Sequence, residues 1–429
     1  MPAASSCTTG TRLSSLPESA LVLGLARSGE AAALALARRG VRVVGVDRNA
    51  ELEAGRLRAA GVEVVLGAED PALVEDVDLL VKSPGVPSEV PLVAAARRRG
   101  LTVWSEVELG SRLLPNPVLG VTGTNGKTTT SELLGAIFRA AERPVAVAGN
   151  VGRPLTGLDG ALADGAWIVC ELSSFQLEDL VSFRPRVAVL LNLTPDHLDR
   201  HGDLDGYRAA KLRIFENQRE DDVAVLPRGF EAVPGEARRI EFAADDPLPA
   251  EPRIPGEHNR ENAAAATAAA RAAGIPDTAI AEGLRTFAGV PHRLELVREL
   301  DGVRWINDSK ATNPEAAERA LGAYPPGLRV ILGGSRKHTP FGGLARGAAL
   351  AGVSCAYLIG ESADEIAEAL AREGVRFRHS RDLESAVRDA REDAEPGDVV
   401  LLSPACASYD QFRDFEERGE QFRELVEAL

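Results

Sequence analysis

The chain has 429 residues, and at about 150 residues per domain this length predicts roughly three domains. Its 45% hydrophobic and 26% charged residues are ordinary for a globular protein, and they exclude a disordered chain, a collagen-like chain and a small disulfide scaffold. A net charge of −15 argues against nucleic-acid and anionic-membrane partners, and no apolar run reaches the ~20 residues of a membrane helix. The first residues lack the pattern of a secretory signal and the four cysteines are scattered, so we expect free thiols and a cytoplasmic location.

Lysine is rare in this chain. Of 49 basic residues, only Lys82, Lys127, Lys211, Lys310 and Lys337 are lysines. Because arginine serves wherever a generic surface charge suffices, the lysines should be enriched at positions that need a compact ammonium or a deprotonatable amine. The alternative is that they are ordinary surface lysines.

The N-terminal region alternates short apolar runs with helical patterns. We expect strands near residues 20–25 and 41–46 with a helix between them, and this alternation continues to residue 104. Such alternation predicts a parallel, doubly wound sheet. The turn from Gly24 to Gly29 resembles a dinucleotide fingerprint but has Ala26 at the middle glycine position. A nucleoside diphosphate at the helix N-terminus is therefore a better interpretation than a nicotinamide cofactor.

A second unit follows the linker at residues 115–117. The apolar run at 118–122 leads into a glycine-rich loop and then a helical pattern. Backbone amides of such a loop surround phosphates, while Lys127 would contact the outer phosphates and Thr128 would bind Mg²⁺. The match to the generic phosphate loop is imperfect, since Gly120 lies one residue upstream of the expected glycine.

Two later segments could complete a metal site. Glu171 ends one apolar run, and Asp196 and His197 follow another at 187–191. Ligand sites of open α/β sheets lie beyond the C-terminal ends of strands, where both segments would fall. Because Mg²⁺ prefers oxygen ligands, an ordinary hydrogen-bonded His197 remains an alternative. Lys211, taken alone, has the pattern of a solvated helix lysine.

The C-terminal region begins near residue 289 and alternates again. Runs at 329–332, 355–359 and 398–402 predict strands, with helices after Phe341 and at 363–373. Three α/β domains therefore agree with the length.

Five sequence blocks stand out, at residues 123–129, 171–178, 207–214, 305–313 and 402–408. Together they resemble the D-glutamate-adding branch of the Mur ligase family, whose ATP loop is shared with folylpolyglutamate synthetases. The weaker loop at Ser83–Gly85 extends the resemblance into the N-terminal region. The departures are a long leader and a short region near residues 226–251.

This resemblance implies an architecture and a reaction. The architecture is α/β with a Rossmann-like N-terminal domain at 1–112, a P-loop-type central ATPase domain at 113–290 and a Rossmann-like C-terminal domain at 291–429. The reaction joins D-glutamate to UDP-N-acetylmuramoyl-L-alanine through an acyl phosphate in peptidoglycan precursor synthesis. We expect a monomer that uses ATP and two Mg²⁺ ions and closes around its substrates to exclude water.

The resemblance also implies roles for individual residues in ATP and metal binding. Lys211 matches a lysine that is carbamylated in the family, which would convert a cation into an oxygen ligand. Catalytic positions are Lys127, His197, Lys211 and Lys310, and metal ligands are Thr128, Glu171, His197 and Lys211. ATP contacts fall on Gly123, Thr124, Asn125, Gly126, Lys127, Thr128 and Thr129, with Asn262 at the adenine, Asp308 at the ribose and Arg293 at the phosphates.

The remaining implied positions bind the other two substrates. Cations and hydroxyls are physically sensible partners for the two carboxylates of D-glutamate. Four of the five lysines thus match site positions, and Lys82 has no assigned role. Ser28, Asp47, Gly85, Asn150, Ser173 and Gln176 would bind the UDP substrate, and Thr312, Lys337, Ser408 and Phe415 would surround D-glutamate.

Four other functions remain open at this point. A sibling ligase would add L-alanine or a diamino acid, but the segments at 175–176 and 405–408 argue against it. Folylpolyglutamate synthesis would not need a UDP-binding first domain. A nicotinamide-dependent dehydrogenase rests on the Gly24 turn alone, and a non-catalytic nucleotide-binding regulator could have lost Glu171 or Lys211.

Overall fold

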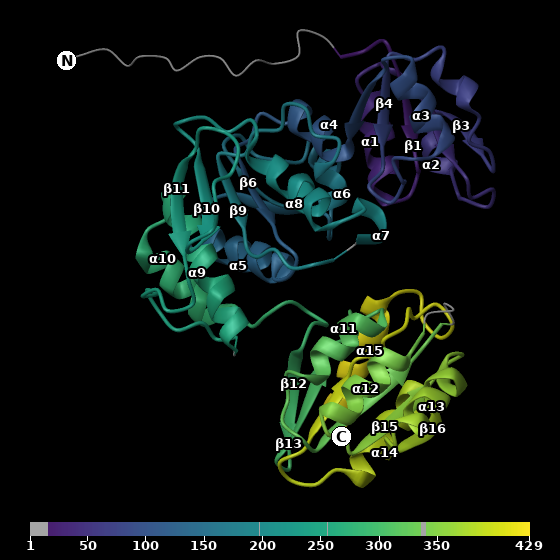
Figure 1. The fold of residues 1–429 in the computed structure, drawn as a ribbon, viewed down its shortest axis with the longest axis vertical. Helices are drawn as coiled ribbons and strands as arrows, with labels where there is room; N and C mark the ends of the chain where they lie inside the picture. Colours follow the sequence, from purple (N-terminus) through teal and green to yellow (C-terminus); the bar gives the residue numbers. More distant parts are fainter. Residues whose placement is uncertain (1–15, 197, 255, 336–339) are drawn as a thin grey trace. The chain divides into compact units, whose positions relative to one another are not determined.

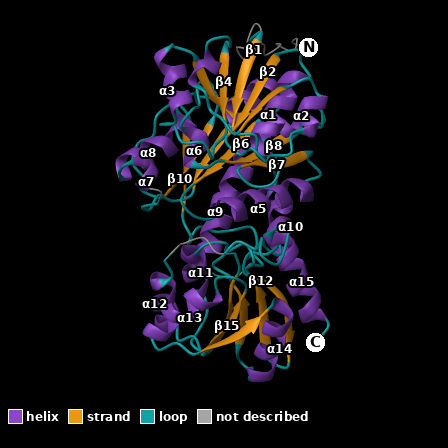
Figure 2. Ribbon diagram, turned by 90° about the vertical axis from the view of Figure 1, so that its right-hand side faces the viewer, coloured by secondary structure: helices purple, strands orange, loops and turns teal. Residues whose placement is uncertain are grey.

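A computed structural model describes residues 16–196, 198–254, 256–335 and 340–429. Contacts divide the chain into two compact units, Met1–Phe287 and Ala288–Leu429. The first unit contains two β-sheets and the second contains one, so the predicted α/β fold with three domains is confirmed (Figures 1 and 2). The predicted boundaries after residues 112 and 290 stay predictions. Among the described residues, no helix is both long and apolar enough to cross a membrane.

The N-terminal sheet has five parallel strands in the order β3-β2-β1-β4-β5. Successive residues of β1 enter opposite cores: Ala20 packs with Leu36 of α1, and Leu21 packs with Leu92 of α3. A parallel sheet covered on both faces explains the continuous apolar runs of its central strands. The elements are β1 (Ser19–Leu23), α1 (Arg27–Ala37), β2 (Arg42–Asp47), α2 (Gly55–Ala59), β3 (Glu63–Leu66), η1 (Pro71–Val74), β4 (Leu79–Lys82), α3 (Pro91–Arg98), β5 (Thr102–Ser105) and α4 (Glu106–Leu113).

The central sheet has six parallel strands in the order β11-β10-β9-β6-β8-β7. Strand β6 lies between β9 and β8, so the loop that follows it opens in the middle of the sheet edge. The alanine-rich helix α9 is closely packed, with Ala263, Ala265 and Ala266 fully buried. The elements are β6 (Val118–Thr122), α5 (Lys127–Ala140), β7 (Val145–Gly149), η2 (Leu155–Leu158), β8 (Trp167–Glu171), α6 (Ser174–Leu177), β9 (Val187–Leu190), α7 (Leu198–His201), α8 (Leu204–Leu212), η3 (Arg213–Phe215), β10 (Val223–Pro227), β11 (Arg238–Phe242), α9 (Glu257–Ala272) and α10 (Asp277–Thr286).

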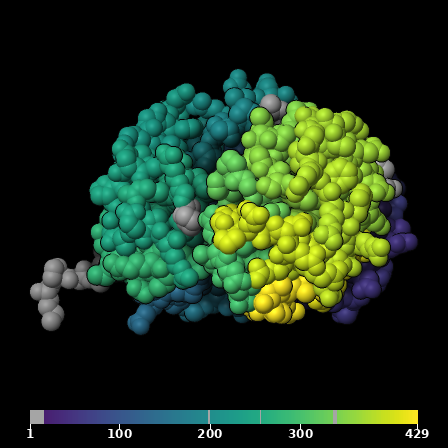
Figure 3. All heavy atoms as spheres, turned by 90° about the horizontal axis from the view of Figure 1, so that it is seen from below, coloured from purple at the N-terminus to yellow at the C-terminus, as the bar shows by residue number. Residues whose placement is uncertain are grey.

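The sheet of the second unit has the order β12-β13-β17-β14-β15-β16. Its two faces carry separate cores, one packed on α11, α12 and α13 and the other on α14 and α15. The chain ends in exposed residues at 427–429, which have the yellow end of the colour scale in Figure 3. The elements are β12 (Glu295–Leu300), β13 (Val303–Asn307), α11 (Pro314–Leu321), β14 (Leu328–Gly333), α12 (Gly342–Leu350), β15 (Cys355–Ile359), α13 (Ala363–Arg372), β16 (Phe377–Arg381), α14 (Leu383–Asp393), β17 (Val399–Leu402) and α15 (Phe415–Glu427).

Strand β12 corrects the expectation of purely parallel sheets. It runs antiparallel to β13, and the two strands are joined by Asp301 and Gly302, whose φ angles are 51° and 78°. Two successive positive φ angles fit the tight hairpin turn that an Asp-Gly pair favours. This dipeptide was the sequence signal for the hairpin.

The cysteine prediction is confirmed for the described residues. Cys170, Cys355 and Cys406 are buried free thiols. Cys7 lies outside the described residues.

Candidate active site

The glycine-rich loop connects β6 to the N-terminus of α5. Gly126 has a φ of 81°, and a Cβ added there would lie 2.2 Å from Asn262 Oδ1. Only glycine can therefore let Asn262 of α9 approach the loop this closely. Lys127 and Thr128 occupy the first turn of α5, where free backbone amides and the helix dipole favour a phosphate.

The loop after β9 braces the glycine-rich loop. Asn125 N donates to Asn192 Oδ1 at 2.8 Å, and Thr124 N donates to the Asn192 carbonyl at 3.1 Å. The Thr124 hydroxyl also lies 3.1 Å from the Tyr207 hydroxyl and donates to the Thr194 carbonyl at 3.0 Å. Sequence reasoning assigned no role to Asn192, Thr194 or Tyr207, because nothing in a linear motif predicts a brace between distant loops.

Two lysines meet at one carbonyl of this loop. Lys127 Nζ donates to Gly123 O at 2.9 Å and to Thr124 O at 2.8 Å, and Lys211 Nζ donates to Gly123 O at 2.8 Å. The Lys211 side chain is only 1% exposed, so the interpretation of it as a solvated helix lysine is wrong. Burial, reinforced by the charge of Lys127 and opposed by Asp196, lowers the pKa of Lys211 to about 7. Burial therefore favours the neutral amine of Lys211 over its ammonium form.

Glu171 lies at the C-terminal end of β8, beside the strand that leads into the loop. The parallel register pairs it with Val121 of β6 and with Gly149 of β7. Its side chain is buried and accepts a hydrogen bond from Asn150 Nδ2 at 3.0 Å, so the structure brings together a predicted metal ligand and a predicted UDP-substrate residue. Within the described part of the chain, no group of three or more His, Cys, Asp or Glu residues could hold a metal, and His197 lies outside it.

Ser173 and Gln176 cap the short helix α6. Gln176 N donates to Ser173 Oγ at 3.3 Å, and Ser173 N donates to Gln176 Oε1 at 3.0 Å. This reciprocal capping box fixes both side chains at the edge of the central sheet. The amide nitrogen Nε2 of Gln176 is buried and has no hydrogen-bond partner among the described residues, which leaves a donor for a ligand.

The three predicted UDP-binding residues of the N-terminal sheet lie at its C-terminal edge. Ser28 is in the first turn of α1, Asp47 ends β2, and Gly85 lies in the exposed loop after β4. Asp47 Oδ2 accepts a hydrogen bond from Leu25 N at 2.6 Å, so the carboxylate shapes the turn before α1. The loops also touch, because Ser83 Oγ donates to the Gly24 carbonyl at 2.6 Å.

In the second unit, Asp308 follows β13 and is buried. Burial raises the pKa of its carboxyl group to about 7, although hydrogen bonds from Ser403 and Leu294 and the charge of Arg293 oppose the shift. Ser403 Oγ lies 2.8 Å from Oδ2, and Leu294 N lies 3.2 Å from Oδ1. Asp308 and the Arg293 segment, both predicted to bind ATP, are therefore neighbours.

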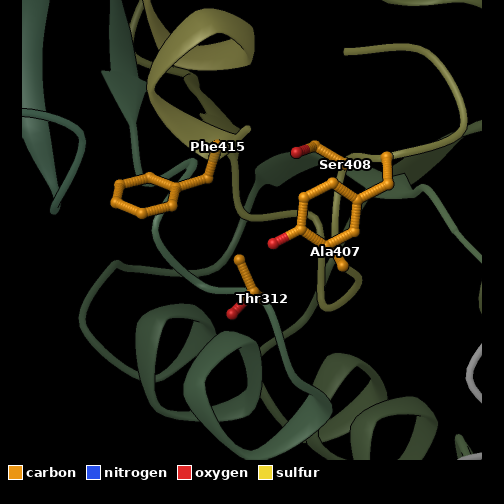
Figure 4. Close-up of a pocket in the computed structure, with 5 residues that line it drawn as sticks. Thr312, Ala407, Ser408 and Phe415 are labelled. Carbon is orange, nitrogen blue, oxygen red and sulfur yellow. The ribbon is translucent and has the colours of Figure 1, made fainter. Parts of the chain in front are cut away.

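A cavity of about 110 Å³ lies where β13 and β17 end. Figure 4 shows Thr312, Ala407, Ser408 and Phe415 around a common space, and Tyr409 completes the lining. Three predicted D-glutamate residues thus come together from segments that are far apart in the sequence. Lys310 Nζ lies 5.9 Å from the centre of the Phe415 ring, and Lys337 lies outside the described residues.

Arg418 holds the loops around this cavity and was missed by sequence reasoning. Its guanidinium is fully buried and donates to Ser309 Oγ at 2.9 Å, to Ser309 O at 2.8 Å and to Cys406 O at 3.1 Å. Burial lowers the pKa of Arg418 to about 10. The three contacts join the segment before Lys310 to the segment before Ser408.

Three family models match this chain, in the order of its three sheets. Residues 18–105 match the Mur ligase MurD-like N-terminal domain, residues 121–242 match the Mur ligase middle domain, and residues 292–406 match the Mur ligase glutamate ligase domain. The crystal structure of UDP-N-acetylmuramate-alanine ligase MurC from Thermotoga maritima has the same fold, with a TM-score of 0.58 and 21% identity over 96% of this chain and 100% of that one. The fold and the three matched domains are those of a Mur ligase.

Curated relatives define the branch. The UDP-N-acetylmuramoylalanine–D-glutamate ligase of Pelotomaculum thermopropionicum is 44% identical over 95% of this chain and 97% of its own. The protein of the same name from Anaeromyxobacter dehalogenans is 45% identical over 94% of this chain and 96% of its own. The chain therefore belongs to the UDP-N-acetylmuramoylalanine–D-glutamate ligase family.

Proposed function

We propose that this chain is an ATP-dependent ligase that joins D-glutamate to UDP-N-acetylmuramoyl-L-alanine in peptidoglycan precursor synthesis. The near full-length similarity to ligases of that name carries the proposal. The same relatives favour this activity over the sibling ligases, folylpolyglutamate synthesis and a dehydrogenase. The proposal includes a cytoplasmic monomer that acts on small molecules, without nucleic-acid or membrane partners.

The reaction must first activate a carboxylate, because its carbon carries an anionic oxygen that leaves poorly. Transfer of the ATP γ-phosphoryl group to that oxygen forms an acyl phosphate and releases ADP. The D-glutamate amine then attacks the acyl carbon, the amide bond forms and phosphate leaves. Lys127 supports this chemistry because its ammonium lies within the loop, where it can offset charge that develops on the phosphoryl group.

The described residues fit a Mg²⁺ ion. Thr128 offers a hydroxyl and Glu171 a carboxylate, and both are the oxygen ligands that Mg²⁺ prefers. We assign these residues to the metal, together with His197 and, for a second ion, Lys211. When bound, the ions would neutralise phosphate charge. Asn150 supports this assignment by holding one oxygen of Glu171 in place.

We assign Lys211 the role of a carbamate. The neutral amine attacks CO₂, a nitrogen–carbon bond forms and one proton is released, which converts a buried cation into an anionic oxygen donor. Two features support this step: the pKa of Lys211 is lowered to about 7, and the side chain is almost completely withdrawn from solvent. An unmodified ammonium would instead add to the charge of Lys127 and repel a metal.

The remaining assignments follow the substrates. The partnerless Nε2 of Gln176 supports a contact to the UDP substrate, and the polar edge of the cavity at Thr312 and Ser408 supports a dicarboxylate. Asn262, next to Gly126, is assigned to the adenine. The UDP substrate is assigned to Ser28, Asp47, Gly85, Asn150, Ser173 and Gln176; D-glutamate to Lys310, Thr312, Lys337, Ser408 and Phe415; and the nucleotide to Gly123–Thr129, Asn262, Arg293 and Asp308.

An amino-acid panel tests the proposal. Phosphate release is measured with ATP, UDP-N-acetylmuramoyl-L-alanine and each candidate amino acid. We expect D-glutamate to be preferred over L-glutamate and D-alanine. Equal turnover with D-alanine would contradict the assignment.

A further inference from the structure

Lys82 is the lysine that the proposed chemistry does not use. It ends β4 and is 1% exposed, directly before the Ser83–Gly85 loop assigned to the UDP substrate. Its Nζ lies 3.0 Å from Asp179 Oδ2 and 3.7 Å from Glu178 Oε2, and it donates to the Val86 carbonyl at 3.2 Å. One buried ammonium therefore bridges the N-terminal sheet and the segment just after α6.

Arg200 of α7 makes a second connection to the same two groups. Its guanidinium donates to the Val86 carbonyl at 3.1 Å and to the Pro84 carbonyl at 3.3 Å, and it lies 3.4 Å from Glu178 Oε2. The Val86 carbonyl and the Glu178 carboxylate are thus each shared by two cations. We call Lys82, Arg200, Glu178, Asp179 and the Val86 carbonyl the clasp.

The clasp joins two segments that the proposed function assigns to one substrate. The loop at 83–86 lies on one side of it, and helix α6, whose capping box is Ser173 and Gln176, ends directly before Glu178. Arg97 adds a contact from α3, with Nη2 3.0 Å from Asp179 Oδ1. The two segments belong to different sheets, and these side-chain contacts hold them together with a backbone hydrogen bond from Ser105 N, at the end of β5, to the Asp179 carbonyl at 3.1 Å.

Burial shows that the clasp is more than a surface ion pair. Exposed pairs contribute little, whereas a buried cation needs closely placed partners. Asp179 Oδ2 forms no directed hydrogen bond with Lys82, so their contact is a close ion pair. Such a pair fixes the distance between the two side chains more than their relative orientation. A lysine suits this place because its compact ammonium can serve two carboxylates and a carbonyl at once.

We propose that Lys82 and Arg200 are positioning residues that hold the 83–86 loop at the separation from Ser173 and Gln176 that the UDP substrate requires. They act on affinity for that substrate, through Val86 and Glu178, and not on phosphoryl transfer. This inference rests on the proposed function.

The test measures binding of UDP-N-acetylmuramoyl-L-alanine by calorimetry without turnover. Lys82→Met keeps the aliphatic stem and removes the charge. If the 83–86 loop of this variant adopts its binding conformation about one tenth of the time, the Kd for UDP-N-acetylmuramoyl-L-alanine rises about 10-fold. The Kd for ATP and the KM for D-glutamate should not change. Arg56→Met is the matched control, because Arg56 forms an exposed ion pair with Glu30 in the same sheet domain.

Each other outcome is decisive. A folded Lys82→Met protein with unchanged affinity for the UDP substrate overturns the inference and leaves the proposed function standing. Equal losses for ATP and the UDP substrate overturn it as well, because they indicate a merely structural role. A wild-type protein that does not bind the UDP substrate overturns the proposed function itself. If Lys82→Met does not fold, Arg200→Met decides the question. This variant loses the two hydrogen bonds to the Pro84 and Val86 carbonyls and the one to Glu178, and binding of the UDP substrate should weaken about 3-fold.

Discussion

The phosphate loop of the first unit and the small cavity of the second are built in different ways. The loop is one continuous segment. The buried lysine that contacts it, Lys211 of α8, has an amine whose pKa is lowered to about 7. The cavity is assembled from separate segments, and its buried cation Arg418 is engaged by backbone carbonyls and a hydroxyl. We propose that the two buried side chains have different roles. Lys211 takes part in the reaction in the first unit, and Arg418 maintains the conformation of the loops around the cavity in the second.

Removal of Lys127 should give the largest effect on activity. Lys127→Ala deletes an ammonium that faces the loop carbonyls, and one such preorganised contact is typically worth ~3–4 kcal/mol, or about 10²–10³-fold in rate. The measurement is steady-state phosphate release, with unfolding followed in parallel. Arg143→Ala, an exposed change after the same helix, is the control and should be silent. Unchanged turnover in folded Lys127→Ala would exclude a phosphate role for the loop.

Among the described residues, each unit contains a buried carboxyl group with a raised pKa: Glu106 in the first unit and Asp308 in the second. Glu106 has no assigned role in the proposed site, whereas Asp308 is assigned to the nucleotide. Burial raises the pKa of Glu106 from its ordinary 4.5 to about 7, although its Oε1 accepts hydrogen bonds from Thr156 N and Oγ1, both at 2.6 Å. The folded state then binds more protons than the unfolded state between these values, so the free energy of unfolding falls as pH rises through that window.

Glu106→Gln should remove this dependence. The difference in the free energy of unfolding between pH 5 and pH 8 should shrink by about 2–3 kcal/mol in denaturant titrations of the variant. The KM for ATP should stay unchanged, whereas Asp308→Asn should raise it. A wild-type pH dependence retained in full by Glu106→Gln would contradict the buried-acid account.

Substitutions at Lys211 test whether this buried lysine acts as a carbamate. Lys211→Arg should be nearly as damaging as Lys211→Ala, because a guanidinium cannot form a carbamate. Since supporting residues of metal sites cost about 10–100-fold, a ligand should cost at least that much. Turnover is measured at saturating Mg²⁺ with and without acetate, which should partly restore the alanine variant but not the arginine variant. A fully active Lys211→Arg enzyme would eliminate the carbamate.

Substitution of Arg418 tests whether this buried arginine maintains the loops around the cavity of the second unit. Arg418→Met leaves the carbonyls of Cys406 and Ser309 buried without this donor, which should cost about 2 kcal/mol of stability. The KM for D-glutamate should rise more than the KM for ATP, because the displaced loops line the cavity. Chemical denaturation and substrate titrations measure the two effects. Equal changes in both KM values would show that Arg418 does not act on the cavity.

The sequence best predicted the features that lie within one continuous stretch of residues. The α/β architecture, the position of the glycine-rich loop between a strand and a helix, and the position of Glu171 at the end of a strand followed from apolar runs and glycine positions. For Lys211, the local helical pattern alone wrongly indicated a solvated lysine, because nothing in that helix shows that tertiary packing buries the amine. The scarcity of lysine and the family resemblance had pointed to a functional position, which stays a prediction. The brace from Tyr207 and the buried Arg418 were invisible for the same reason, since their partners lie far away in the chain.

Other features that were not predicted did leave a recognisable pattern in the sequence. The Asp301-Gly302 pair marks the β12–β13 hairpin, yet regular strand–helix alternation was extended across it. Lys82 was noticed only through the scarcity of lysine, and its role depended on carboxylates of another sheet. The residues around the cavity came from a family resemblance, because three separate segments contain no single motif.

The most direct test of the account follows oxygen atoms from the substrate. UDP-N-acetylmuramoyl-L-alanine with an ¹⁸O-labelled terminal carboxylate is incubated with ATP, Mg²⁺ and D-glutamate, and the released phosphate is analysed by mass spectrometry. If the carboxylate is activated by phosphoryl transfer, each phosphate released with the amide product carries one labelled oxygen. Phosphate without label, alongside normal product formation, would contradict the acyl-phosphate route.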